Sequence, residues 1–174
     1  DNICTHCYSW TMLKTFRKNM APALQRNSDL LTSKILHSDA LPIINQAFFR
    51  FNSHGELDLD KKKATINLIN YINIAIKNPH CNFALWTKRF DIIKPYFDKN
   101  KKPKNFILIY SNPKINHIFK KPPKHFDRTF NNVYEDIEVD KQNCTGQKCK
   151  DCLLCYKLNT TDTIVEKVKS YGKK

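Results

Sequence analysis

A chain of 174 residues, of which 41% are hydrophobic, is long enough for one domain with a real core and too apolar to be a disordered chain. Its formal net charge of +14 gives it a surface that attracts polyanions. No apolar run approaches the length of a membrane span and no secretory signal is visible, so we expect a cytoplasmic protein that does not contact membranes. The chain begins at Asp1 without a Met, which leaves open a missing upstream segment.

The first predicted elements are a helix, a strand and a second helix. Residues 9–31 read as helical, with a break or kink at Pro22. The short aromatic run at 47–53 ends in polar turn residues, which predicts a buried strand. Isoleucines at helical spacing then predict a helix over 59–78, which stops before Pro79.

The second half of the chain continues this alternation. The predicted elements are a strand over 82–88, a helix over 89–100 that Pro95 interrupts, a strand over 105–112, a Pro-rich basic loop, a strand over 132–139 and a closing helix over 161–174.

This order of strands and helices is typical of a parallel sheet with crossover connections. The predicted fold class is therefore α/β, either an open parallel sheet or a partial β/α barrel. We expect a β/α domain over 1–139, with residues 140–174 forming a cysteine-rich metal-binding segment and the closing helix, packed on the same domain.

Polar residues gather where the predicted strands stop. The carboxyl ends of parallel strands share one edge of the sheet, and ligands bind there. The residues at these ends are Arg50, Asn52, Ser53, Thr87, Lys88 and Ser111. Ordinary turn chemistry also places polar residues after strands, so the argument for a binding site depends on the coincidence across three strands.

Four of the seven cysteines lie within twelve residues, at Cys144, Cys149, Cys152 and Cys155. Four thiolates at this density are typical of one tetrahedral zinc ion or one iron–sulfur cluster. The two-residue spacings of the last three resemble ferredoxin-type runs, which favours a 4Fe-4S cluster over zinc. The tight spacings and the odd count argue against a disulfide scaffold and indicate a reducing compartment.

Cys4 and Cys7 form a second, shorter pattern. The pair is either half of a zinc site that downstream cysteines complete, or the rear part of a three-cysteine motif that begins before Asp1. Cys81 stands at the start of an apolar strand and is expected to be a core residue.

Two stretches resemble radical S-adenosylmethionine enzymes. Those enzymes carry a cysteine motif in an early loop, and their second strand ends in a Gly-Gly-Glu-Pro-like stretch that holds the amino group of the cofactor. Here "CTHCY" at 4–8 precedes a strand that runs into "SHGEL". Gly55 and Glu56 match the last Gly and the Glu of that pattern, whereas His54 and Leu57 depart from it.

A closer resemblance is to the "gene product 88" family of phages and mobile elements. That family has a cysteine-rich start ending in Cys-x2-Cys-Tyr, an Arg followed by a Gly-acidic pair, polar residues at later strand ends, and cysteines near the C-terminus. The matching residues are Cys4, Cys7, Tyr8, Arg50, Gly55, Glu56, Thr87, Lys88, Ser111 and Cys144 to Cys155.

The resemblance implies a radical-enzyme-like fold with one or two iron–sulfur clusters, acting in the host cytoplasm. A cluster on Cys4 and Cys7 would bind and reduce S-adenosylmethionine, Glu56 would hold its amine, the strand-end residues would line the substrate pocket, and the downstream cluster would be auxiliary. Two departures are that no third cysteine precedes Cys4 and that the chain is too short for an eight-stranded barrel.

The alternative function belongs to a different class, a zinc-stapled basic module that binds nucleic acid or a host protein as a regulator or inhibitor. Between Lys94 and Arg128 there are ten basic residues and two acidic ones. The aromatic residues that would stack on bases are Tyr96, Phe97, Phe119 and Phe126. A solvated Lys-rich face and core packing of these aromatics are the simpler interpretations.

Overall fold

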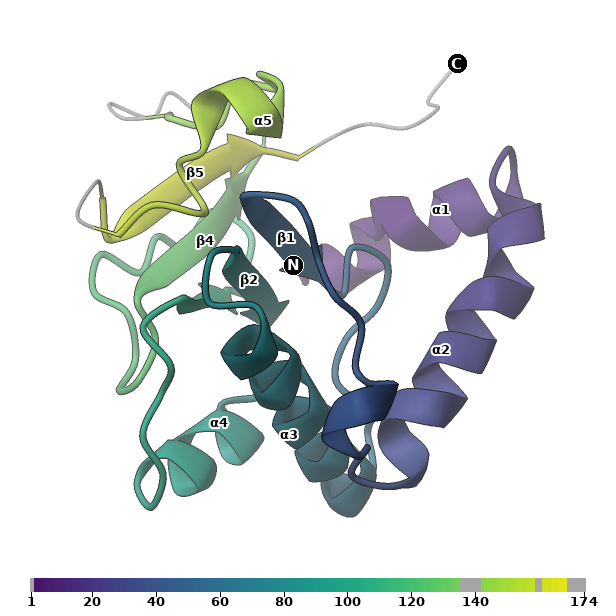
Figure 1. Ribbon diagram of the computed structural model, residues 1–174. Helices are drawn as coiled ribbons and strands as arrows, with labels where there is room; N and C mark the ends of the chain where they lie inside the picture. Colours follow the sequence, from purple (N-terminus) through teal and green to yellow (C-terminus); the bar gives the residue numbers. More distant parts are fainter. Residues whose placement is uncertain (1, 135–141, 159–160, 169–174) are drawn as a thin grey trace.

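Five short segments of the chain form strands, and all five join one parallel sheet (Figure 1). The computed structural model describes residues 2–134, 142–158 and 161–168. Within these residues the sheet is open and its strands follow the order of the sequence, with every neighbouring pair parallel. The strands are β1 (Phe48–Phe51), β2 (Asn82–Thr87), β3 (Phe106–Ser111), β4 (Arg128–Val133) and β5 (Thr163–Lys167).

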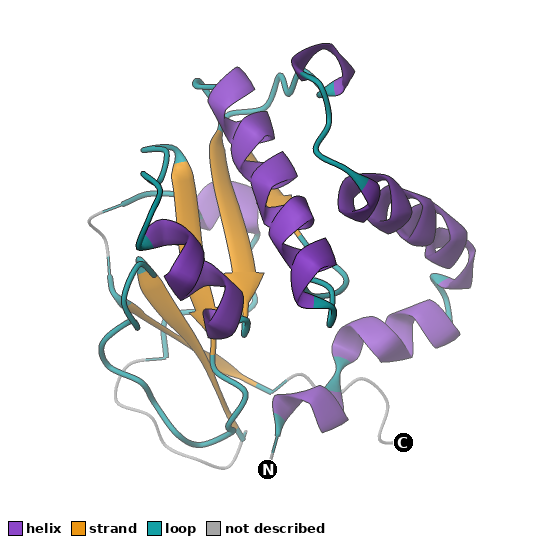
Figure 2. Cartoon of the chain, turned by 90° about the horizontal axis from the view of Figure 1, so that it is seen from below, coloured by secondary structure: helices purple, strands orange, loops and turns teal. Residues whose placement is uncertain are grey.

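Helices connect the first three strands and precede them. The α-helices are α1 (Tyr8–Lys14), α2 (Ala21–Ser33), α3 (Lys61–Lys77), α4 (Phe90–Phe97) and α5 (Cys149–Cys152), and the short 3-10 helices are η1 (Ile3–His6), η2 (Lys18–Met20) and η3 (Ser38–Ala40). Figure 2 shows α3 and α4 on one face of the sheet, α5 behind the opposite face, and α1 and α2 beside α3.

The two faces of the sheet bury different residues. Because side chains alternate along a strand, Phe83 and Leu85 of β2 face the helices, while Ala84 and Trp86 face the other way. The helical face forms the larger core, with α3 and α4 packed on it. On the opposite face Tyr156, from the cysteine-rich segment, is buried against β2 and β3. The sheet therefore holds the C-terminal segment over the face that the long helices leave open.

Helix α3 begins and ends at clear local signals. The carboxylate of Asp60 accepts a hydrogen bond from the backbone N–H of Lys63 at 2.9 Å, which caps the helix. At the other end Asn78 precedes Pro79, and its side chain donates to the carbonyl oxygens of Pro42 and Ile74. The end of α3 is thus fastened to the connection that leads into β1.

The predicted closing helix over 161–174 is wrong, because its described part forms β5. Residues 163–167 pair with β4 along their whole length. Ile164 and Val165 are both buried, so both faces of this strand are covered, and β-branched residues favour such a setting. The apolar spacing alone did not distinguish the two structures. Residues 169–174 lie outside the described part of the chain.

Two other predicted boundaries move. The expected helix over 9–31 is two helices, and the break falls at Thr15–Arg17, before Pro22, which stands in the first turn of α2 where proline is tolerated. The strand expected at 132–139 begins earlier, at Arg128, and ends at Val133. Residues 135–141 lie outside the described part of the chain. None of the described helices is long and apolar enough to cross a membrane.

Candidate functional site

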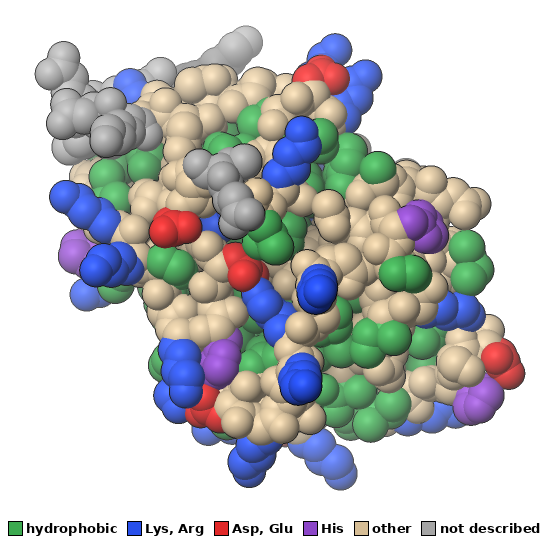
Figure 3. All heavy atoms as spheres, turned by 60° about the vertical axis from the view of Figure 1, so that its left-hand side comes forward, with side chains coloured by type: hydrophobic (Ala, Val, Ile, Leu, Met, Phe, Trp, Pro, Cys, Tyr) green, Lys and Arg blue, Asp and Glu red, His purple; other side chains and the backbone are tan. Residues whose placement is uncertain are grey.

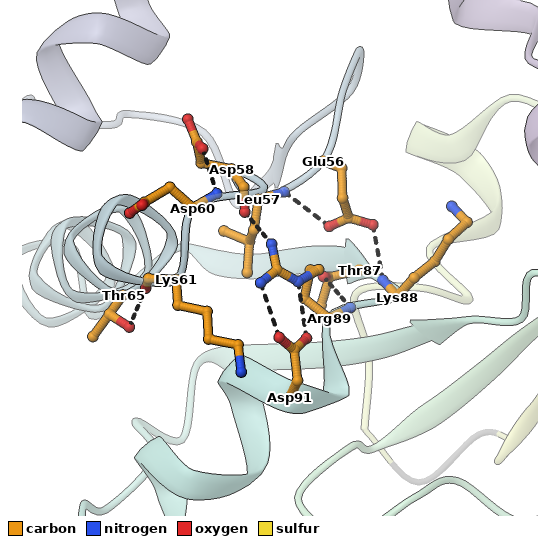
Figure 4. A network of polar contacts seen from close by, with 10 residues as sticks. All are labelled: Glu56, Leu57, Asp58, Asp60, Lys61, Thr65, Thr87, Lys88, Arg89 and Asp91. Carbon is orange, nitrogen blue, oxygen red and sulfur yellow. Dashed lines mark hydrogen bonds and ion pairs between the residues drawn. The ribbon is translucent and has the colours of Figure 1, made fainter.

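The loop that follows β1 is tied to the loop that follows β2 (Figure 4). Glu56 makes this connection, because one carboxylate oxygen accepts the N–H of Leu57 at 2.9 Å and the other accepts the N–H of Lys88 at 2.8 Å. Gly55, just before it, has a φ of +130°, which side-chain-bearing residues rarely adopt. The Gly-Glu pair therefore has a structural task that needs no ligand, namely holding two strand ends together.

Arg89 extends the same network toward α3 and α4. Its guanidinium pairs with the Asp91 carboxylate at 2.8 Å and also donates to the Asp58 carbonyl oxygen. The Thr87 hydroxyl accepts the Arg89 backbone N–H at 3.0 Å and is fully buried. Thr87 and the backbone of Lys88 thus shape the strand ends, and Figure 4 shows the Lys88 ammonium pointing away from the Arg89–Asp91 pair.

Arg50 lies on the face of the sheet that the cysteine-rich segment covers. Its guanidinium sits over the ring of Trp86, 4.1 Å from the ring centroid, in cation–π contact. The Nε atom of Arg50 is buried and has no hydrogen-bond partner among the described residues. Because a buried donor without an acceptor costs free energy, this nitrogen is a candidate contact for a bound group.

Arg128 stands on the same face and is even more enclosed. It pairs in register with Ile109, which pairs with Trp86, so the three residues form one row across the sheet. Arg128 is 1% exposed. One terminal nitrogen donates to the Lys157 carbonyl oxygen, whereas the other, Nη1, is buried without a partner in the described structure.

The cysteine-rich segment passes over these two arginines. The backbone of Cys144 forms an isolated parallel β-bridge with Glu166 of β5. The Cys144 sulfur lies 3.6 Å from a Glu166 carboxylate oxygen. Cys149 and Cys152 are the first and last residues of α5, and Leu153 then adopts a left-handed conformation with a φ of 55°. This turn brings Cys155 and Tyr156 down onto the sheet, where both pack against the smaller core.

The electrostatics of Cys155 connect the segment to the arginines. Burial, together with the neighbouring Cys144 and Cys149, raises the pKa of the Cys155 thiol to about 12. Arg50 and Arg128 act in the opposite direction. Three cysteine sulfurs and two guanidinium groups therefore share one environment, in which the thiol keeps its proton unless something compensates the negative charge of the thiolate.

The cysteines do not form a metal site as they lie in the described part of the chain. Within the described ranges, no three Cys, His, Asp or Glu side chains are arranged so that they could hold a metal ion. None of the seven cysteines forms a disulfide in the described part of the chain. Cys149 is exposed, Cys144 and Cys152 are half-buried, and the Cys152 sulfur accepts a weak hydrogen bond from Gln147 at 3.4 Å.

The N-terminal cysteines lie at the carboxyl edge of the sheet. The Ile3 N–H donates to the Pro113 carbonyl oxygen at 2.8 Å, just past the end of β3. The Tyr8 hydroxyl donates to the Ser53 carbonyl oxygen at 3.0 Å, just past the end of β1. Cys4 and Cys7 are held between these two anchors, Cys4 exposed and Cys7 half-buried.

His54 is a neutral residue at the same edge. Its Nε2 lies 3.2 Å from an Arg17 guanidinium nitrogen, which can only donate, so Nε2 accepts. The proton is then on Nδ1, which donates to the Ser9 hydroxyl at 2.7 Å. Burial first, and then the positive charges of Arg17 and Arg50, lower the pKa of this imidazole.

The predicted site residues separate into three groups. One cavity is lined by Arg50, Asn52, Ser53, Gly55 and Glu56. Thr87 and Lys88 support it through the network of Figure 4. Ser111 pairs with Phe130 on β4 and is not among the residues that line the cavity.

Sequence reasoning missed Trp86 and Arg128, which come from the sheet, and Tyr156, which follows Cys155; all three belong to the surroundings of Cys155. One signal was available for Arg128, which is the first residue of a strand that is mostly buried. Arginine is almost never fully buried unless it has a partner. Trp86 and Tyr156 gave no such signal, since aromatic residues in apolar segments usually serve the core.

The basic block from 94 to 128 uses most of its aromatics for packing. Phe97 and Phe126 are buried, and Tyr110 meets both Phe119 and Phe126 edge-on. Asp98 pairs with Lys94, Lys124 and His125 at 2.5, 2.7 and 2.8 Å. Figure 3 brings forward the side on which β4, β5 and α4 lie, and its Lys and Arg side chains are dispersed among hydrophobic and acidic ones.

Comparison with known proteins gives one match. The model of the family described as "Gene product 88" matches residues 2–162. No curated protein and no solved structure matches the chain.

Proposed function

This chain belongs to the gene product 88 family, and we propose that it is an iron–sulfur protein in which Cys144, Cys149, Cys152 and Cys155 hold a 4Fe-4S cluster against the open face of the sheet. The reaction that we propose for it is of the radical S-adenosylmethionine type, on a substrate that enters from the carboxyl edge of the sheet.

The observation that carries the proposal is a pair of arginines, the half-buried Arg50 and the enclosed Arg128, whose positive charges act on Cys155. Arg50 Nε and Arg128 Nη1 are both buried without partners in the described structure. Both positive charges act on Cys155. A cluster bound by four thiolates is anionic, and its sulfurs accept hydrogen bonds, so it would satisfy both nitrogens and both charges. A buried guanidinium nitrogen without an acceptor is otherwise costly.

To hold a cluster the four cysteines would have to move toward one another, because no three possible ligands lie around one point among the described residues. Cys155 is packed on the sheet, so it provides the fixed ligand. Cys149 and Cys152 lie in a single helical turn, and the backbone of Cys144 pairs with Glu166 of β5. Short turns between ligands are what allow a chain to wrap around a cluster. When bound, a 4Fe-4S cluster supplies one-electron transfer.

The N-terminal cysteines are proposed to take part in binding S-adenosylmethionine. Cys4 and Cys7 would provide two ligands at the carboxyl edge, where Tyr8 and Ser53 join the N-terminal segment to the loop after β1. Glu56 lies on that loop and has lone pairs beyond those that accept the Leu57 and Lys88 amides. We propose that the carboxylate holds the cofactor's amine while it keeps this structural task.

The second candidate function is a zinc-stapled module that binds nucleic acid or a host protein. The same four thiolates would then hold zinc, which also prefers cysteine ligands. The positive charge available for binding a nucleic acid is smaller than the sequence indicates, because three lysines form ion pairs. Asp98 pairs with Lys94 and Lys124, and Asp127 pairs with Lys102. We therefore rank this function second.

The test is the metal content of cysteine variants that are produced and purified without oxygen. Cys152→Ala should remove the iron and the acid-labile sulfide of the C-terminal site, because it deletes one of four ligands. Cys81→Ala is the matched control, since Cys81 is buried in the helical core and should leave iron unchanged. Equal iron and sulfide in the two variants would refute the assignment.

A further inference from the structure

Helices α1 and α2, with η2 between them, form an N-terminal arm over residues 8–33 that stands beside α3 (Figure 2). Figure 1 shows the corner where α1 turns into α2 at the far right of the molecule, away from the sheet. Every residue from 14 to 22 is exposed at this corner. Because none of these side chains is buried in the core, the corner is accessible to another molecule.

Two aromatic rings of the arm lie in solvent. Trp10 of α1 is 62% exposed, and Phe16, which follows two residues after the end of α1, is 69% exposed. Phenylalanines elsewhere in the chain serve the core, as Phe83 and Phe106 do. Exposed aromatic side chains that gather in one short segment are typical of an interaction site.

Each of these rings has a positive group beside it. The Lys14 ammonium, one turn further along α1, lies 4.2 Å from the centroid of the Trp10 ring. The guanidinium carbon of Arg17 lies 5.9 Å from the centroid of the Phe16 ring. Both distances are within the range of cation–π contacts. The arm therefore presents flat apolar faces next to positive charges.

Carboxylates do not neutralise the charge of the arm. Residues 2–28 contain four Lys and Arg residues and no Asp or Glu. The four are Lys14, Arg17, Lys18 and Arg26. None of them forms an ion pair in the described part of the chain. In the basic block from 94 to 128, by contrast, aspartates pair with three lysines. The positive charge of the arm thus remains available to a polyanion.

We propose that the N-terminal arm binds single-stranded nucleic acid, whose bases stack on Trp10 and Phe16 and whose phosphates pair with the basic side chains beside these rings. Proteins that bind single strands combine aromatic platforms with a positive surface in this way. The bases of a single strand have free faces, whereas those of a duplex are already stacked on one another. None of the proposed cluster ligands lies in the arm, so this binding does not depend on the cluster.

An anionic membrane fits the arm less well. A helix that lies on a membrane needs an apolar face that is free of protein. In α1 the apolar residues are used within the molecule, because Met12 is buried and Leu13 lines the cavity beside α3. The exposed rings of the arm stand among charges instead of forming such a face.

The test is the binding of fluorescein-labelled oligothymidylate, about 20 nucleotides long, to the full chain, followed by fluorescence anisotropy. If the four basic residues each neutralise one phosphate, the affinity should fall about fiftyfold when the salt concentration rises from about 50 to about 200 mM. The absence of saturable binding at the lower salt concentration would overturn the proposal.

Substitutions locate the binding surface. Trp10→Ala and Phe16→Ala should each lower the affinity at least about fivefold, because each removes a stacking platform. Leu59→Ala, at a position that is 91% exposed and outside the arm, is their control. Lys18→Glu should lower the affinity severalfold more than Lys62→Glu, at an exposed position of α3. If the arm variants bind as tightly as the controls, while circular dichroism shows that all are folded, the strand binds elsewhere and the proposal is wrong.

Tryptophan fluorescence reports on the ring itself. The chain has two tryptophans, and the ring of Trp86 is covered by Arg50 on the sheet. Unlabelled oligothymidylate should quench the emission of Trp10 when a base stacks on it, and Trp10→Phe should abolish this quenching while it keeps an aromatic platform. Quenching that persists in Trp10→Phe would overturn the proposal. Sedimentation of the chain with phosphatidylserine vesicles, without any binding of oligothymidylate, would overturn it in favour of a membrane.

Discussion

At Arg128 a guanidinium is almost entirely enclosed, and one of its terminal nitrogens has no partner in the described structure. A buried charge of this kind is a cost for the metal-free protein, and burial lowers the pKa of the group. Under the proposed function, this residue contributes more to binding the anionic cluster than to holding the chain together. The same reasoning applies to Arg50, whose Nε is also buried without a partner among the described residues.

Arg128→Met separates these two contributions. Methionine has a similar volume, so the free energy of unfolding of the metal-free protein should change by less than about 1 kcal/mol. Iron retained after anaerobic gel filtration should fall severalfold, because the charge that offsets the thiolates is gone. Urea unfolding and iron content measure the two effects, with exposed Arg26→Met as the control. Unchanged iron retention would show that Arg128 does not act on the cluster.

His54 makes the stability of the fold depend on pH. Its pKa is lowered from 6.5 in the folded protein, so the unfolded chain takes up a proton first as the pH falls. The stabilising contribution is therefore complete above about pH 6.5 and is lost as the pH falls toward the lower folded value. Urea unfolding from pH 8 to pH 5 should show this loss, and His54→Gln should make the slope shallower. A variant with the same slope as the unchanged chain would exclude His54 as its source.

At the scale of elements, asparagine side chains fasten α3 to the segments that precede the sheet. Asn70 is fully buried, and its oxygen accepts the Leu36 N–H at 2.9 Å. Its nitrogen donates to the carbonyl oxygens of Leu31 and Lys34 at 2.8 and 2.9 Å. One side chain thus satisfies three backbone groups at the end of α2, which fixes the wall of the cavity.

Asn70→Ala should therefore loosen α2 more than the sheet. Three backbone groups lose their partner, so we expect a loss of about 3 kcal/mol in the free energy of unfolding. Hydrogen exchange should accelerate in residues 21–36 while β2 and β3 stay protected. Lys62→Ala, at an exposed position of α3, is the control. Uniform acceleration across the whole chain would contradict this assignment to α2.

Glu56 joins two strand ends, and its replacement tests that role. Glu56→Gln keeps one acceptor oxygen but sets an amide nitrogen against a backbone N–H of Leu57 or Lys88. We expect a loss of about 1–2 kcal/mol in the free energy of unfolding. Asp39→Asn, on an exposed turn, is the comparison. A variant as stable as the unchanged chain would mean that these two amide contacts contribute little to the fold.

The elements that could be predicted from the sequence are those whose pattern has one interpretation. The apolar runs that became β2 and β3 carried strand signals, and α3 had both spacing and an end signal at Pro79. Residues 163–167 carried two compatible patterns, since alternating and helical spacing overlap in a short apolar run. Only the partner strand β4 decides between them, and pairing over more than thirty residues of sequence has no local signal.

At the scale of the whole molecule, the sheet separates two environments. Long helices cover one face, and the cysteine-rich segment covers the other, where Arg50 and Arg128 each have a buried nitrogen without a partner in the described structure. The strand-end residues were predictable because parallel strands end at one edge. The arginine and aromatic surroundings of Cys155 were not, because they come from β1, β2 and β4, which only the folded sheet brings together.

The most direct measurement is the iron, zinc and acid-labile sulfide content of the chain produced and purified without oxygen, together with its visible spectrum. The account predicts about four iron atoms and an equal amount of sulfide in the C-terminal site, with a brown colour and broad visible absorption. Zinc in place of iron, with no sulfide, or a colourless protein without metal, would contradict the assignment of Cys144, Cys149, Cys152 and Cys155 as cluster ligands.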